Sequence, residues 1–192
     1  MSEKEVLLVL TDNWADWEAA YAIAGINEES AYTVITVAVD LAPKASIGGL
    51  RVEIDKCVKD CCNFENIALV ILPGGYSWKE NEYPEIAEFV REAAAHDVPI
   101  AAICGATVFL GKHGILDNIL HTGFEYEAFQ REQGYHGHDH YVSAQIVIDK
   151  GFITANETAA VEFAHAIFHL LKIDTDKEID SWYDYFKNGM VQ

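Results

Sequence analysis

The chain has 192 residues, of which 51% are hydrophobic and 23% are charged, and its formal net charge is −18. This composition is typical of a globular domain, and the acidic balance disfavours nucleic acids and anionic membranes, whose phosphate groups it would repel. Every apolar run falls short of the roughly 18 residues of a membrane span, and the first one, only five residues long with acidic flanks, is typical of a strand and not of a signal peptide. We therefore expect one cytoplasmic domain over residues 1–192, with no nucleic-acid or membrane partner.

The first half of the chain alternates between apolar runs and helical patterns. The runs at 5–10, 32–39 and 67–75 predict buried strands. Residues 14–26 predict a helix, and the Gly-Gly signal within 47–55 predicts a short hairpin.

The second half continues this alternation. Residues 83–96 predict an amphipathic helix, with Pro84 suited to its first turn. The strand predicted at 98–104 leads into another helix, and two short strands flank a turn at Lys150 and Gly151.

A long helix is predicted at 157–171, with Asn156 as its N-cap, and an acidic helical tail covers about 174–192. The tail carries an aromatic stripe that is expected to pack on the domain, with a subunit contact as the alternative. Strand–helix alternation of this kind predicts an α/β fold with a mostly parallel sheet and helices on both faces.

Chemically useful residues follow the predicted strands, at the sheet edge where ligands of open α/β folds bind. Cys104 stands between the strand 98–104 and a helix that begins at Gly105. This junction, with small neighbours, is typical of a nucleophile elbow, and the helix N-terminus is expected to lower the pKa of the thiol. The alternative is a cysteine that only fills space in the core.

A glycine pair and a carboxylate accompany this cysteine. The backbone N–H groups of Gly75, in the motif LPGG, and of Gly105 could form an oxyanion hole. Glu18 lies on the first predicted helix, where a protonated carboxyl could donate a hydrogen bond to the thiolate or act as acid or base. Taken singly, these residues would be an ordinary turn and a surface carboxylate.

Together, in this order, the motifs resemble the ThiJ/PfpI superfamily. The resemblance runs from VLLVLTDNWADWE through LVILPGGYSW and IAAICGATVFLGKHGIL to FITANETAAVEFAHAIFHLL, and looks closest to the bacterial protease I or intracellular amidase-like branch. It implies a single-domain, flavodoxin-like fold of the class I glutamine amidotransferase type, and a homodimer. It also implies that Cys104 is the reactive cysteine, Glu18 its paired acid, and Gly75 and Gly105 its amide donors.

The sequence departs from the family pattern at its histidines. Many members have a histidine after the elbow helix that completes a triad, whereas here His121 falls a few residues early and Phe124 takes that place. The late His-x-Glu pair of glutamine amidotransferases does not occur in the sequence. Glutaminase activity is therefore not expected, and His121 and His138 are the candidates to complete the site.

Two groups of histidines and one of cysteines suggest metal-ligand chemistry. The alternating histidines of YHGHDHY (136–140) could bind a metal or lie in a polar loop near the cleft. His165 and His169 are one helical turn apart but lack the glutamate of a zincin, so they are expected on a packed or exposed helix face. The cysteines of DKCVKDCCNFEN match no common zinc spacing. We therefore expect no metal and no cofactor.

The leading functional hypothesis is a cysteine-dependent enzyme that acts on a small electrophilic carbonyl compound, in a glyoxalase-like, deglycase-like or amidase-like reaction. The alternative is a redox sensor or stress-response protein that works through oxidation of Cys104. A scaffold without chemistry, acting through its acidic and aromatic C-terminal surface, is the third possibility.

Overall fold

The centre of the fold is a seven-stranded sheet in the computed structural model, which describes residues 4–29 and 31–190. Neighbouring strands are parallel, except that β8 runs antiparallel to β9. Across the sheet the strands lie in the order β5 (Lys56–Cys57), β2 (Tyr32–Ala38), β1 (Lys4–Val9), β6 (Ile67–Leu72), β7 (Ile100–Ile103), β9 (Phe152–Ala155) and β8 (Ile146–Asp149). This order places β1, β6 and β7 side by side, so the segments that follow these three strands meet at one edge of the sheet.

Burial on both faces explains the continuous apolar runs of the central strands. In β1, Leu7 and Val9 contact one helix layer while Val6 and Leu8 contact the other, and all four side chains are buried. Strands covered on both faces need apolar residues at every position. Each such aliphatic side chain stabilises the fold by about 1.5–3 kcal/mol relative to exposure.

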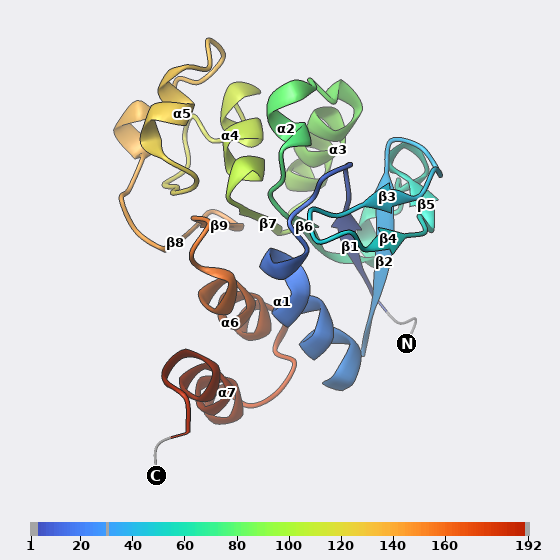
Figure 1. The fold of residues 1–192 in the computed structure, drawn as a ribbon, viewed down its shortest axis with the longest axis vertical. Helices are drawn as coiled ribbons and strands as arrows, with labels where there is room; N and C mark the ends of the chain where they lie inside the picture. Colours follow the sequence, from blue (N-terminus) through green and yellow to red (C-terminus); the bar gives the residue numbers. More distant parts are fainter. Residues whose placement is uncertain (1–3, 30, 191–192) are drawn as a thin grey trace.

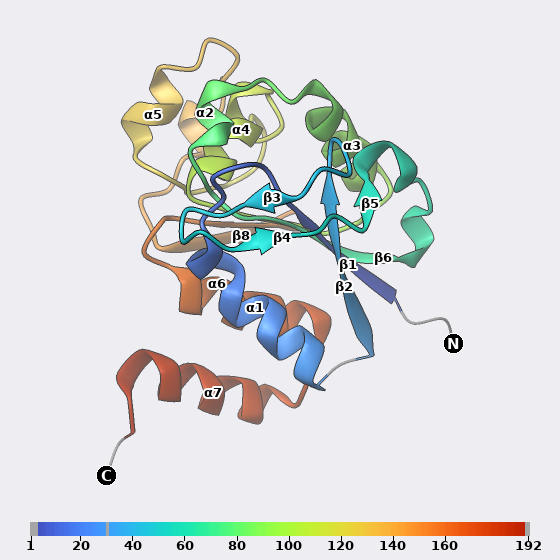
Figure 2. The ribbon, with the colours of Figure 1, turned by 45° about the vertical axis from the view of Figure 1, so that its right-hand side comes forward.

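Helices cover both faces of the sheet (Figure 1). In Figure 2, α1 and α6 lie against one face with α7 outside them, and the remaining helices lie across the sheet from them. One layer contains α1 (Asp16–Glu29), α6 (Ala160–Leu171) and α7 (Asp176–Asn188), and the other contains α2 (Ser77–Glu80), α3 (Pro84–Ala95), α4 (Gly105–Lys112) and α5 (Tyr126–Gln130). Within the described part of the chain, no helix is both long and apolar enough to span a membrane.

The smaller elements lie around this framework. A separate antiparallel hairpin joins β3 (Lys44–Ala45) to β4 (Arg51–Val52), which confirms a hairpin around the Gly-Gly turn with shorter strands than expected. Three 3-10 turns, not predicted from the sequence, lie at Val58–Asp60, Phe64–Asn66 and His138–His140.

The predicted start of the last core helix is wrong. Asn156 is not its N-cap, because α6 begins at Ala160 and no side chain caps it from Ala159. The Oδ1 atom of Asn156 instead accepts a hydrogen bond from the Thr158 N–H at 3.0 Å. Asparagine often bonds the backbone two residues on in this way, and the resulting turn delays the helix.

The C-terminal helix packs on the domain through aromatic side chains, as the stripe predicted. The ring of Trp182 lies 4.8 Å from that of Phe168 and 5.9 Å from that of Tyr21, and the ring of Phe186 lies 5.1 Å from Tyr21. Tyr185 and Phe186 nevertheless remain 53% and 44% exposed. Helix α7 therefore forms an outer layer over α1 and α6.

Candidate active site around Cys104

Cys104 occupies a strained turn between β7 and α4. Its backbone angles are φ 56° and ψ −127°, a region that non-glycine residues rarely adopt. Two hydrogen bonds hold this turn. The Cys104 N–H donates to the Ala155 carbonyl at 2.9 Å, and the Thr107 hydroxyl donates to the Cys104 carbonyl at 2.6 Å. A costly conformation kept at the end of a central strand is typical of a functional site. The structure thus has the geometry of a nucleophile elbow at Cys104.

Glu18 approaches this thiol from the first turn of α1. The carboxylate is 1% exposed, its Oε2 accepts a hydrogen bond from the Gly74 N–H at 2.6 Å, and it is hydrogen-bonded to the Cys104 thiol. Burial raises the pKa of Glu18 from 4.5 to about 7, although the hydrogen bonds from Gly74 and Cys104 partly oppose this shift. Near neutral pH, Glu18 is therefore partly protonated and can both donate a proton to the sulfur and accept one from it.

The pKa of the Cys104 thiol is shifted upward, opposite to the direction predicted from the helix N-terminus. Burial is the main cause, and the neighbouring Glu18 carboxylate adds to it through its charge and its hydrogen bond. The Gly105 N–H does lower the pKa, as expected, but by less than these effects raise it. Because two close ionisable groups titrate as a unit, the pair retains a proton at neutral pH. That proton can lie on Glu18, leaving a thiolate, or on the sulfur.

Gly75 and Gly105 lie next to each other beside the sulfur. A Cβ atom built on Gly105 would lie 3.1 Å from the Gly75 carbonyl oxygen and 3.7 Å from the Gly75 nitrogen. No hydrogen bond among the described residues uses the Gly75 N–H, and the Gly105 N–H faces Cys104. This proximity is compatible with two amide donors acting on one oxyanion.

Gly74 is a site residue that the sequence analysis did not single out. A Cβ atom at this position would lie 2.6 Å from Glu18 Oε2 and 2.7 Å from the Cys104 Cβ, closer than real atoms approach. Only glycine therefore leaves room for Glu18 and Cys104 to touch. The LPGG motif contains both glycines, and they have different roles. Gly74 leaves room for the contact between Glu18 and Cys104, and Gly75 supplies the free N–H.

We expect Gly74→Ala to slow alkylation of Cys104 by iodoacetamide at pH 7 by about tenfold or more, because a displacement of even 1 Å can cost that much in reactivity. Peptide mass spectrometry measures the rate. Gly151→Asn is the control, since its Cβ would meet nothing within 4 Å and asparagine tolerates its φ of 80°. An unchanged rate in Gly74→Ala would show that the Glu18 contact does not govern the thiol.

Glu157 acts on this site through its charge alone, and the sequence did not indicate it. Its charge raises the pKa of both Cys104 and Glu18. Glu157 follows β9, which pairs in parallel with β7. Its position after a parallel strand was the feature of the sequence that could have placed it near Cys104. The position lies on a surface where a carboxylate is ordinary, which is why the sequence did not distinguish it.

His121 is buried away from this pair. The ring is 0% exposed, with Nδ1 2.7 Å from the Ile119 carbonyl and Nε2 2.8 Å from the Tyr135 hydroxyl. Since a carbonyl only accepts, Nδ1 carries the proton and Nε2 accepts from Tyr135. Burial also lowers the pKa of His121, which favours this neutral form. None of its described contacts reaches Cys104 or Glu18.

His138 is exposed on the 3-10 turn His138–His140. Its Nδ1 lies 3.3 Å from the Tyr126 hydroxyl, and its ring contacts the ring of Tyr135. Its described contacts also stop short of Cys104 and Glu18. The structure therefore brings together Cys104, Glu18 and the two glycines, while the two histidines are held by other partners.

The fold and this site define a class: a flavodoxin-like α/β protein with a cysteine at a nucleophile elbow and a buried carboxyl beside it. The family model described as the DJ-1/PfpI family matches residues 4–170. The chain belongs to this family.

Individual relatives agree with this assignment. The chain is 35% identical over 178 residues to the "uncharacterized protease YdeA" of Bacillus subtilis (strain 168), covering 92% of this chain and 88% of that protein. It is similar in structure to a ThiJ/PfpI family protein from Bacillus anthracis, with a TM-score of 0.89, 30% identity, and coverage of 97% and 92% of the two chains. A DJ-1 superfamily protein from Agrobacterium tumefaciens gives a TM-score of 0.88 at 26% identity, with coverage of 97% and 100%.

Proposed function

We propose that this protein is an enzyme that converts small α-oxoaldehydes to 2-hydroxy acids, with Cys104 as the nucleophile. The observation that carries the proposal is the contact between the Cys104 thiol and Glu18, a buried carboxyl whose pKa of about 7 allows it to give and take a proton near neutral pH. We also retain the expectation of a small-molecule substrate and a homodimer, the latter testable by light scattering.

The reaction balances with the residues present and one water. Glu18 takes the proton of the Cys104 thiol as the sulfur forms a C–S bond to the aldehyde carbon, and the N–H groups of Gly75 and Gly105 stabilise the oxyanion. Glu18 then gives that proton to the oxyanion, which produces a hemithioacetal. The Glu18 carboxylate removes the hydrogen of that carbon as a proton and returns it to the neighbouring carbonyl carbon. The hydroxyl proton of the hemithioacetal passes to the neighbouring oxygen, so the neighbouring carbon becomes an alcohol and the carbon bonded to sulfur becomes a thioester carbonyl. Water hydrolyses the resulting thioester, which releases the acid and restores the thiol. The oxidation of one carbon is matched by reduction of its neighbour, so no outside oxidant is needed.

Aldehydes fit this site better than amides do. Amide hydrolysis needs a group that protonates the departing nitrogen, usually a histidine. The described contacts engage both His121 nitrogens in the core and connect His138 to tyrosines. The word "protease" in the names of the Bacillus subtilis relatives therefore makes peptide cleavage a competing outcome to be measured.

Oxidation of Cys104 is the second candidate function, because the thiol is partly exposed and lies beside both a carboxyl and a backbone N–H donor. These donors can stabilise a sulfinate formed by peroxide. One experiment separates the proposals: incubate the purified chain with methylglyoxal, with a peptide amide, or with hydrogen peroxide, and follow products by NMR and Cys104 by mass spectrometry. Lactate formation supports the enzyme, amide cleavage supports the protease, and sulfinate without turnover supports the sensor.

We expect His138→Ala to leave methylglyoxal turnover within about twofold of the parent chain, because Glu18 alone handles the proton in this reaction. The comparison is kcat/KM across pH 6–9. His136→Ala is the matched control from the same exposed loop. A loss of tenfold or more confined to His138→Ala would make His138 the proton carrier and would reopen amide hydrolysis.

A further inference from the structure

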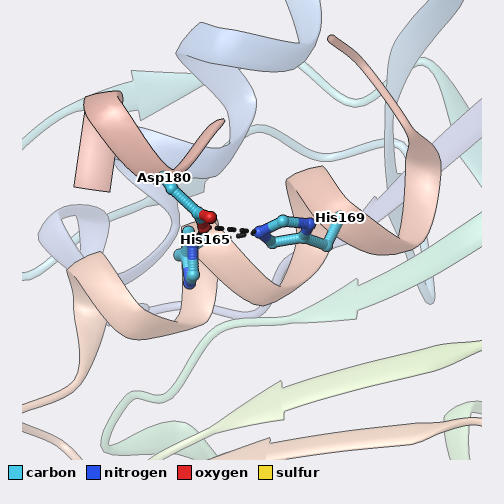
Figure 3. A group of neighbouring side chains, drawn as sticks. All are labelled: His165, His169 and Asp180. Carbon is cyan, nitrogen blue, oxygen red and sulfur yellow. Dashed lines mark hydrogen bonds and ion pairs between the residues drawn. The ribbon is translucent and has the colours of Figure 1, made fainter. Parts of the chain in front are cut away.

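A second group of titratable side chains lies between α6 and α7, outside the Cys104 site. His165 and His169 project from adjacent turns of α6, and Asp180 reaches them from α7 (Figure 3). Among the described residues, these three form a group whose ligand atoms all lie within 4.8 Å of one another. Helix α6 therefore supplies two of the three candidate ligands, and α7 supplies the third.

The three ligand atoms are spaced for a single ion. His165 Nε2 lies 2.8 Å from Asp180 Oδ1, His169 Nε2 lies 3.0 Å from the same oxygen, and the two nitrogens are 3.1 Å apart. Atoms at these separations lie on a circle of radius about 1.7 Å. An ion with the roughly 2.0–2.2 Å bonds of zinc to nitrogen and oxygen contacts all three from just above their plane.

A second carboxylate orients one of the histidines. His169 Nδ1 lies 3.2 Å from Asp176 Oδ1, so Asp176 holds a proton on this nitrogen and leaves Nε2 as the atom that binds an ion in place of its hydrogen bond to Asp180. A carboxylate behind a histidine in this way fixes the tautomer that a metal requires. An ion that binds between His169 Nε2 and Asp180 Oδ1 replaces the proton that these two atoms share.

The cluster opens into a hollow through which an ion and water can enter. This hollow has a volume of about 610 Å³ and includes His165, His169, Glu162 and Tyr183 in its lining. Glu162 lies one turn before His165, and its buried Oε2 has no hydrogen-bond partner among the described residues. Its other oxygen, Oε1, is paired with Lys187 and accepts a hydrogen bond from Tyr183, so the charge of Glu162 is compensated and this residue is a neighbour of the cluster rather than a fourth ligand.

We propose that His165, His169 and Asp180 bind one divalent transition-metal ion of the zinc class, with water completing its coordination. Two imidazoles and one carboxylate suit Zn²⁺, Co²⁺, Ni²⁺ and Cu²⁺ and disfavour Mg²⁺ and Ca²⁺, which prefer oxygen ligands. The ion joins α7 to α6. Because the ligands share no residue with the Cys104 site, the proposal stands apart from the proposed enzyme function.

Titration of the full chain with Zn²⁺ against a chromophoric chelator tests the site, and Co²⁺ serves as the spectroscopic probe. The background chain is Cys62→Ser, which removes the exposed thiol. We expect one equivalent of Zn²⁺ to bind, and His165→Ala and Asp180→Asn each to weaken binding by at least tenfold. Asp176→Asn should weaken it by about tenfold through the orientation of His169.

His136→Ala is the matched control, an exposed histidine outside the cluster, and should bind Zn²⁺ as the background chain does. Asp180→Asn guards against misfolding, since Asp180 is largely exposed and the exchange is isosteric. Equal binding by His165→Ala and the background chain would overturn the proposal. So would a thiolate-to-cobalt charge-transfer band, which would assign the ion to cysteine ligands.

Discussion

Replacing Cys104 with alanine is expected to reduce α-oxoaldehyde turnover to the rate measured without protein, a loss of about 10³-fold or more, because the bond-forming atom is removed. No other described thiol can substitute. Cys57 and Cys61 are buried, burial raises the pKa of Cys61 to about 11, and Cys62 is exposed without a neighbouring carboxyl contact. Lactate formation from methylglyoxal, followed by NMR, measures the effect.

The matched control is Cys62→Ser, which should retain full turnover. Circular dichroism and urea unfolding establish that Cys104→Ala is folded, since alanine must adopt the φ of 56° that Cys104 has. Turnover in Cys104→Ala above about a tenth of the parent rate would contradict a covalent mechanism. It would also remove the reason to regard the strained turn as catalytic.

The strained turn itself argues for function over packing. A non-glycine residue in this region of φ and ψ costs about 1–3 kcal/mol, which a buried cysteine serving only to fill space would not require. The turn directs the sulfur to the edge where β1, β6 and β7 end, next to Glu18 and the glycine pair. The strain is offset by burial elsewhere in the sheet.

The sequence predicted those parts of the site that depend on strand ends. Parallel strands align their carboxyl ends, so apolar runs followed by Gly75 and Cys104 were enough to place these residues together. Glu18 could be placed because α1 begins where β1 ends. Fold class followed from the same alternation of strands and helices, and the structure confirms it.

What the sequence did not predict depends on packing between distant segments. The upward direction of the Cys104 pKa shift follows mainly from the burial of the thiol itself and then from the neighbouring Glu18 carboxylate, and no local pattern reveals either. The hydrogen bond of His121 Nε2 is made by the Tyr135 hydroxyl, from a residue 14 positions further along the chain. His165 and His169 appeared to lack a third ligand, because Asp180 approaches only through the docking of α7 on α6.

Glu18→Gln is expected to raise the free energy of unfolding by about 3 kcal/mol at pH 8 and to leave it nearly unchanged at pH 4. The Glu18 carboxyl has a pKa of about 7 in the folded chain against 4.5 ordinarily, so the folded state binds its proton more tightly. The stabilisation from neutral Glu18 is fully present below pH 4.5 and is lost as the pH rises through 7. Glutamine stays neutral and retains it.

Urea unfolding of both chains at pH 4 and pH 8 measures this difference, with Glu65→Gln as the control because Glu65 is exposed. The control pair should differ by no more than about 0.5 kcal/mol at either pH. A Glu18→Gln chain that is less stable than its parent at pH 8 would mean that the ionised carboxylate stabilises the fold. The protein would then keep Glu18 for packing. If instead the stability gained by Glu18→Gln grows with pH, the parent chain sacrifices stability to hold a proton beside the Cys104 sulfur.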